Sequence, residues 1–266
     1  MTMLCTACGT AYPSAAPDEH CKICEDERQY VPAAGQRWIA FDELRGSHAN
    51  KWTAHSDALL SLKTVPEFAI NQRAFLLRTP HGNVLWDCIA NLDDATYTLI
   101  AALGGIDAIA ISHPHYYTTM QEWAEVFNAP IHLHARDRQW IVRLSPHIQL
   151  WQGESLTLMP GVTLLRLGGH FPGGCVLHWD EGEGVMLAGD IIQVTPGAHG
   201  VSFLWSYPNM LPLSAATVSD IMHRLSGVTF GQLYGAFEGQ DIHHQAKEKV
   251  MRSGEKYLAC LQEHQA

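Results

Sequence analysis

The stretch Ile111-Ser112-His113-Pro114-His115-Tyr116-Tyr117-Thr118 places two histidines two positions apart, directly after the apolar run 108–112. A short apolar run is typical of a buried strand. On an extended stretch, side chains at i and i+2 lie on the same face. His113 and His115 are therefore candidate ligands of one metal ion. Such a pair is weak evidence alone, because the chain contains 16 histidines.

Two later segments and one earlier segment add to this pair. Gly168-Gly169-His170-Phe171-Pro172-Gly173-Gly174 is a turn whose four glycines leave room for close backbone approach around one histidine. Leu187-Ala188-Gly189-Asp190 sets a carboxylate just past an apolar strand, and Val84-Leu85-Trp86-Asp87 repeats that arrangement. The three segments offer His170, Asp190 and Asp87 as further candidate residues.

With these motifs the chain resembles the metallo-β-lactamase-like superfamily of metallo-hydrolases over residues 66–262. That family has the pattern H-x-H-x-D-H, then G-H-x-P-G, then G-D, with a strand-end D-T-G earlier and a final histidine later. The resemblance implies a four-layer αββα sandwich. It also implies that His113, His115 and His170 bind the first metal, that Asp190 is the carboxylate that bridges two metals, and that Asp87 orients a ligand.

The chain departs from the family pattern where the second metal would bind. Tyr117 and Thr118 stand at the D and H of H-x-H-x-D-H, and no final histidine is evident. Glu238, His243 or His244 could substitute, although the two histidines are expected to be exposed on the last helix. In addition, Cys88 and Ile89 stand in place of T and G after Asp87. The interpretation is a single ion, Zn²⁺ or Fe²⁺.

The departures also change the candidate catalytic groups, which are Asp190 and Tyr117. A phenol cannot act as a base at neutral pH, because its ordinary pKa is about 10. Tyr117 could instead donate a hydrogen bond to an oxyanion or protonate a leaving group. The alternative is that Tyr117 packs in the pocket wall. Thr118 is explained by N-capping of a helix over 118–127, whose capping box is either Thr118 with Gln121 or Thr119 with Glu122.

Four of the seven cysteines are crowded at the start of the chain, in two C-x-x-C pairs: Cys5, Cys8, Cys21 and Cys24. Four thiolates at this spacing close a tetrahedron suited to Zn²⁺, and with four protein ligands the zinc would be structural. Free or redox-active thiols are the alternative interpretation. A rubredoxin-like zinc knuckle ahead of the main domain also resembles one branch of the superfamily.

The order of elements predicts a mixed α/β fold of the α+β type, with a small N-terminal zinc-ribbon module. We expect the zinc knuckle at residues 1–30, a connector at 31–65 and the metallo-β-lactamase-like domain at 66–266. Helical spacing marks 95–103, 118–127, 215–225 and 241–262. Strand patterns mark 67–78, 84–88, 108–112, 130–134, 156–158, 163–167, 175–179, 184–187 and 231–234.

The composition argues against some classes of binding partner. With 17 basic and 27 acidic residues the formal net charge is −10, which makes nucleic acid a poor partner. The N-terminus lacks the basic start and apolar stretch of a signal peptide, and the apolar segment 99–111 is too short and interrupted to cross a bilayer. We expect a cytoplasmic protein with a small-molecule substrate. A homodimer is possible.

Three functions remain open at this point. The leading hypothesis is a mononuclear hydrolase that acts on a small ester, thioester or lactone through metal-activated water. The second is an iron oxygenase like the persulfide-oxidising members of the superfamily, with His113, His170 and Asp190 as ligands. The third is a non-catalytic, metal-stabilised binding domain. The aromatic-rich segment 201–209 is expected to cap the metal or to form an oligomer contact.

Overall fold

The computed structural model describes residues 1–13 and 20–262, which form two compact units, Met1–Trp151 and Gln152–Ala266. The predicted knuckle at 1–30 and the predicted domain at 66–266 include residues 14–19 and 263–266, which lie outside the described residues. The predicted boundaries at 30 and 65 stay predictions. Among the residues described, no helix is long and apolar enough to span a membrane.

The first unit begins with a small antiparallel sheet that carries the cysteines. Its strands are β1 (Met3–Cys5), β2 (Ala11–Tyr12) and β3 (Trp38–Ala40), in the order β2-β1-β3. The short helix α1 (Phe41–Ser47) follows directly and buries Leu44 against Leu4 and Ala11. The small sheet therefore shares a hydrophobic cluster with the chain that follows it.

The main sheet of the first unit has seven strands in the order β10-β9-β8-β7-β6-β5-β4. Two of them, β4 (Ala49–Ala54) and β5 (Leu59–Val65), lie in the stretch where the sequence predicted a connector. β4 is an edge strand in which Trp52 is the one large apolar side chain and no residue is fully buried, so its hydrophobic pattern is weak. The other strands are β6 (Arg73–Thr79), β7 (Gly82–Trp86), β8 (Ala108–Ala110), β9 (Ile131–His134) and β10 (Ile148–Trp151).

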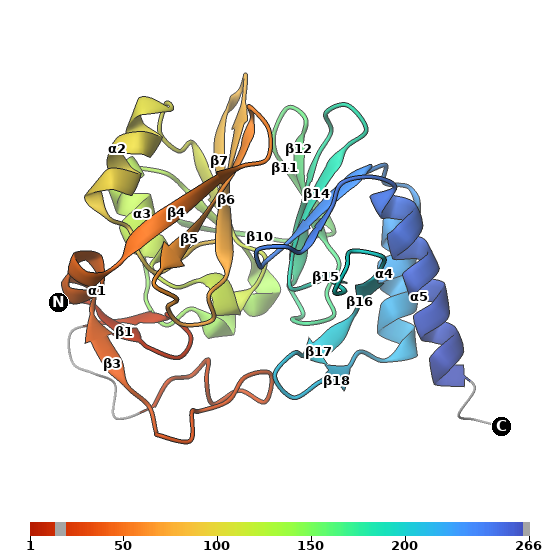
Figure 1. The fold of residues 1–266 in the computed structure, drawn as a ribbon, viewed down its shortest axis with the longest axis horizontal. Coiled ribbons are helices and arrows are strands. Elements are labelled where there is room, and N and C mark those ends of the chain that lie inside the picture. Colours follow the sequence, from red (N-terminus) through yellow and green to blue (C-terminus); the bar gives the residue numbers. More distant parts are fainter. Residues whose placement is uncertain (14–19, 263–266) are drawn as a thin grey trace. The chain divides into compact units, whose positions relative to one another are not determined.

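Two helices connect the parallel strands β7, β8 and β9 and lie along one side of this sheet (Figure 1). Helix α2 (Asp94–Ala102) begins where Asp93 accepts a hydrogen bond from the N–H of Thr96 at 2.7 Å. Helix α3 (Met120–Phe127) has Thr119 as its N-cap without a side-chain bond. The predicted capping by Thr118 is therefore wrong, because the helix begins one residue later.

The second unit contains a six-stranded sheet in the order β11-β12-β13-β14-β19-β20, with helices α4 (Ala215–Ser226) and α5 (Ala246–Gln262) packed on each other at one side (Figure 1). Helix α5 starts later than predicted, because the short strand β20 (Asp241–Ile242) precedes it. The strands are β11 (Ser155–Met159), β12 (Val162–Arg166), β13 (Cys175–Trp179), β14 (Val185–Gly189) and β19 (Gln232–Gly235).

Between β14 and α4 the chain forms two small hairpins. These are β15 (Gln193–Val194) with β16 (Val201–Ser202), and β17 (Leu204–Ser206) with β18 (Leu211–Pro212). Phe203, between the two hairpins, is fully buried in the core that α4 and α5 share with the sheet. The aromatic-rich segment is thus anchored to this core rather than extended into solvent.

The loop 168–174 between β12 and β13 is a tight turn that carries His170. The N–H groups of Leu167 and Gly168 both donate to the carbonyl of Gly174 at 2.9 Å, and Gly174 N–H donates to Phe171. A Cβ atom at Gly174 would lie 2.6 Å from Ile191 Cδ1 and 3.0 Å from two backbone oxygens. The position therefore needs glycine for space, and the loop geometry depends on it.

We expect Gly174→Ala to destabilise the fold by about 1–3 kcal/mol, because the added methyl overpacks a loop that cannot relax. Thermal unfolding measures this. The matched control is Gly227→Ala at the end of α4, where an added Cβ meets nothing within 4 Å and φ is −86°. That control should stay within about 0.5 kcal/mol of the wild type. Equal melting temperatures for both variants would contradict the packing account.

Candidate metal centres

The four N-terminal cysteines come together in the first unit. The Sγ atoms of Cys5 and Cys24 are 3.6 Å apart, those of Cys8 and Cys21 are 3.5 Å apart, and all four ligand atoms lie within 4.8 Å of one another. A tetrahedral zinc with Zn–S bonds of about 2.3 Å needs sulfurs separated by about 3.8 Å. All four side chains are buried. The cluster is consistent with the predicted zinc knuckle.

Two polar side chains donate hydrogen bonds to these sulfurs. The Gln36 amide donates to Cys5 Sγ at 2.8 Å, and the Tyr12 hydroxyl donates to Cys21 Sγ at 3.4 Å. Hydrogen bonds from Cys24 and Cys5 hold the pKa of the Cys21 thiol well below its usual range. Burial raises the pKa of Cys8, and the hydrogen bond to Cys21 raises that of Cys24. Metal binding would require all four thiols in the deprotonated form.

His113 and His115 lie at the carboxyl end of strand β8, with ring centroids 4.9 Å apart. His113 directly precedes a single turn of 3-10 helix, Pro114–Tyr116, and His115 lies within it. The sequence had predicted an extended stretch here. Proline at the first position of the turn presets its φ for helical geometry. Both rings are buried. The predicted pairing of the two rings is present, although the backbone that produces it differs.

Asp87 is linked to His113 by hydrogen bonds through Ser112. It follows β7, which is parallel to β8, so Asp87 and Ser112 stand at the same edge of the sheet. The Asp87 carboxylate accepts a hydrogen bond from Ser112 N–H at 2.7 Å, and Ser112 Oγ lies 2.8 Å from His113 Nδ1. Asp87 has a left-handed φ of 59°, which aspartate tolerates better than most residues. The chain of contacts runs from Asp87 to His113; the role of Asp87 in orienting a ligand stays a prediction.

In the second unit, His170 and Asp190 are connected through the aromatic-rich segment. His170 Nδ1 lies 2.8 Å from the carbonyl oxygen of Trp205. A carbonyl can only accept, so Nδ1 carries the proton and Nε2 keeps its lone pair for a metal. The ring of Tyr207 packs edge-on against His170 at 5.3 Å, and its hydroxyl donates to the backbone carbonyl of Asp190.

Tyr207 is held in the protonated form that this bond needs. Burial, with the nearby Asp190 charge, raises the pKa of Tyr207 well above its usual range. Two residues of the segment 201–209, Trp205 and Tyr207, touch His170, and the capping of a metal by this segment stays a prediction. Neither the Trp205 carbonyl nor the Tyr207 contact has a sequence signal, since the first is a backbone group and the second lies seventeen positions after Asp190.

Tyr117 and Thr118, the two positions at which the resemblance implied ligands of a second metal, are buried beside the histidines. Tyr117 follows the 3-10 turn directly, with its N–H donating to the Pro114 carbonyl at 3.2 Å. Thr118 has a left-handed φ of 31°. His243 and His244 are exposed as predicted, although they precede the last helix. Among the described residues, neither they nor Glu238 belongs to a group able to hold a metal.

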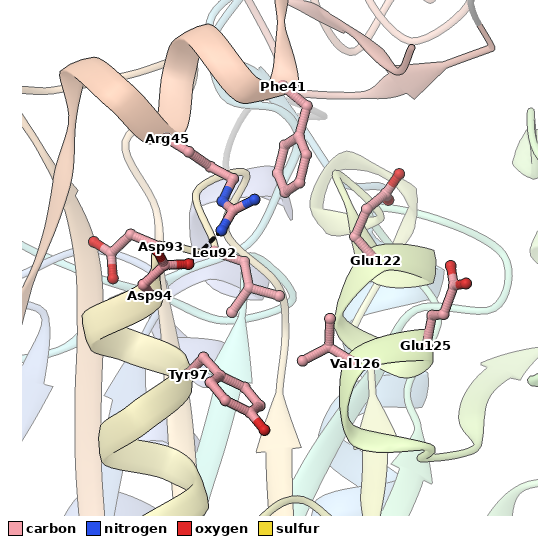
Figure 2. A pocket seen from close by; sticks show the side chains of 9 residues that line it. All are labelled: Phe41, Arg45, Leu92, Asp93, Asp94, Tyr97, Glu122, Glu125 and Val126. Atoms are coloured by element: carbon pink, nitrogen blue, oxygen red, sulfur yellow. Dashed lines mark hydrogen bonds and ion pairs between the residues drawn. The ribbon is translucent and has the colours of Figure 1, made fainter.

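The first unit also contains a cavity of about 420 Å³ between α1, α2 and α3 (Figure 2). Phe41, Tyr97 and Val126 contribute apolar side chains to its lining, and acidic residues beside α2 and on α3 line it as well. Arg45 pairs with Asp94 at its rim. None of the predicted site residues lines this cavity, so we assign it no part in the metal chemistry.

Comparison with known proteins gives the family. No protein-family model matches the chain. It is 46% identical over 264 residues to the uncharacterized protein YmaE of Bacillus subtilis (strain 168), which covers 97% of this chain and 96% of that protein. Such similarity over nearly the full length of both proteins shows common membership of one family.

Solved structures give the fold. VMB-1 matches with a TM-score of 0.58 at 10% identity, over 82% of this chain and 98% of that one. The metallo-β-lactamase SMB-1, solved in complex with mercaptoacetic acid, matches with a TM-score of 0.55 at 15% identity, over 81% and 97%. At these identities the likeness shows the fold alone, and it confirms the predicted fold class. The chain therefore belongs to the family of YmaE and has the metallo-β-lactamase fold.

Proposed function

We propose that the protein is a metal-dependent hydrolase in which His113, His115, His170 and Asp190 hold a single ion. The observation that supports the proposal is a buried pair of donors in each unit, on a chain with the metallo-β-lactamase fold: His113 with His115 in the first unit, and His170 with Asp190 in the second. Buried histidine and aspartate side chains are costly unless they are paired or coordinate a metal. His113 and His115 follow strand β8, His170 lies in the turn between β12 and β13, and Asp190 follows β14.

The donor set fits Zn²⁺ or Fe²⁺, because both accept imidazole and carboxylate ligands. The Trp205 carbonyl fixes the His170 tautomer that leaves Nε2 for the metal, and Ser112 can do the same for His113. The replacement of two second-metal ligands by Tyr117 and Thr118 supports a mononuclear centre. For the four cysteines we propose a structural Zn²⁺.

The substrate that we propose is a small ester, thioester or lactone. A bound ion would supply Lewis acidity toward the carbonyl and a lowered pKa for water. The residues of the chain would provide the remaining functions. Tyr117 donates its phenolic proton toward the oxyanion or the leaving group. Trp205 and Tyr207 fix the orientation of His170 and the backbone at Asp190.

Metal analysis of single-site variants separates the two centres. Wild type should hold one ion at each centre, His170→Ala should lose only the ion at the histidines, and Cys21→Ser should lose only the cysteine zinc. Elemental analysis after dialysis measures both. The control His223→Ala, on the exposed face of α4, should keep both ions. Unchanged metal content in His170→Ala would contradict the proposed ligand set.

Turnover of generic ester and thioester substrates tests the hydrolase assignment. We expect His170→Ala to lose at least about 100-fold in kcat/KM, because its metal-dependent activation of water is removed. His223→Ala should match the wild type. Equal rates for wild type and His170→Ala would exclude metal-dependent hydrolysis. Bound metal without turnover of any of these substrates would favour the metal-stabilised binding domain instead.

Tyr117→Phe tests the proton donor. Loss of the hydroxyl should lower kcat by about 100-fold, the typical contribution of one positioned acid, while the metal content stays unchanged. The matched control is Tyr30→Phe, because Tyr30 is 59% exposed. If kcat is unchanged in Tyr117→Phe, the side chain packs in the pocket wall and takes no part in proton transfer.

A further inference from the structure

The cysteine knuckle touches the segment that carries the paired histidines at two points. The first is a backbone hydrogen bond from the N–H of Ala11, in β2, to the carbonyl of Thr118 at 3.1 Å. The carbonyl belongs to a threonine with a left-handed φ of 31°, a conformation that is strained for a β-branched residue. Such a conformation persists only where neighbouring groups stabilise it, and the hydrogen bond from Ala11 is one of the stabilising contacts.

The second point is a side-chain contact to a proposed metal ligand. Gln29 Nε2 lies 3.4 Å from His115 Nδ1, within hydrogen-bonding distance. Gln29 follows the second C-x-x-C pair by five residues.

The segment between the cysteines and Gln29 is ordered by its own hydrogen bonds. Glu25 N–H donates to the carbonyl of Cys21 at 3.0 Å, and Gln29 N–H donates to that of Asp26 at 2.9 Å. The Asp26 carboxylate accepts from both the N–H and the guanidinium of Arg28, at 3.0 and 2.8 Å. Through this turn the position of Gln29 depends on the metal-binding cysteines.

We propose that Gln29 is a positioning residue for His115, so that the cysteine knuckle helps to hold the ion at the histidines. The inference rests on the proposed function, since it concerns the same His/Asp ion. The amide lies against Nδ1 of His115, so Nε2 is the ring nitrogen that would bind the metal. The amide oxygen can accept from Nδ1–H after a half-turn of the amide group, and this hydrogen bond restrains the imidazole.

The test is zinc affinity at each centre, measured on the full chain by competition with a chromophoric chelator. Loss of a group that orients a metal ligand typically costs 10–100-fold in affinity. Gln29→Leu should therefore keep the cysteine zinc while the Kd of the histidine zinc rises about 10–100-fold. Gln29→Glu, which keeps an acceptor oxygen, should stay close to the wild type. The control Tyr30→Ala changes the exposed neighbouring side chain and should leave both affinities unchanged.

Cobalt substitution gives a readout that a purely structural role would not change. In Gln29→Leu the d–d bands of Co²⁺ at the histidines should shift, while the thiolate charge-transfer bands of the cysteine site stay in place. A histidine-site Kd equal to that of the wild type would overturn the inference and leave the proposed function intact. Loss of both ions in Gln29→Leu would also overturn it, because the defect would then be general. If wild type binds only the cysteine zinc, the proposed function itself fails.

Discussion

The Asp87 carboxylate accepts a hydrogen bond from the N–H of Ser112 at 2.7 Å, and this bond joins the carboxyl ends of two parallel strands. Parallel strands bring their carboxyl ends to one edge of a sheet, where polar groups from separate parts of the chain converge. A metal ion requires donors fixed with small tolerance, and loops alone rarely provide this. The bond between Asp87 and Ser112 fixes the point at which the sheet ends and the histidine segment begins.

In the second unit the proposed donors are positioned by a different set of contacts. His170 stands in a turn closed by hydrogen bonds to Gly174, where a Cβ atom would clash with Ile191. The ring is oriented by the carbonyl of Trp205 and by the face of Tyr207. These contacts come from the segment after Asp190, so the carboxylate and the groups that orient the imidazole belong to one continuous stretch. Each unit thus delivers a buried, oriented pair of donors.

The sequence contains local signals for the proposed donors, whereas it contains none for most of the groups that lie against them. His113, His170 and Asp190 stand in short motifs that follow apolar runs, and periodicity and glycine placement are local signals. The Trp205 carbonyl and the Gln29 amide reach the histidines from 35 and 86 positions away, and no local pattern marks a contact of that kind. Strand β4 was not predicted because Trp52 is its one large apolar side chain. The predicted capping by Thr118 was wrong because helix α3 begins one residue later, with Thr119 as its N-cap.

The cysteine cluster and the histidine segment form a connected structure within the first unit. The Ala11–Thr118 and Gln29–His115 contacts link a compact, cysteine-held turn to the histidine segment. A structural metal site is usually explained by the folding energy that it supplies to a short segment. We propose that a metal at the cysteines has a second consequence, because the segment that follows them lies against His115, a proposed ligand of the other ion. Stability at one centre and affinity at the other would then be coupled.

The most direct test of this account is a crystal structure with anomalous scattering measured at the zinc and iron absorption edges. The account predicts two anomalous peaks for each chain. One should lie among Cys5, Cys8, Cys21 and Cys24 at about 2.3 Å from each sulfur. The other should lie about 2.0–2.2 Å from donor atoms of His113, His115, His170 and Asp190. A peak at the cysteines alone, or a second peak that contacts the histidines of only one unit, would contradict it.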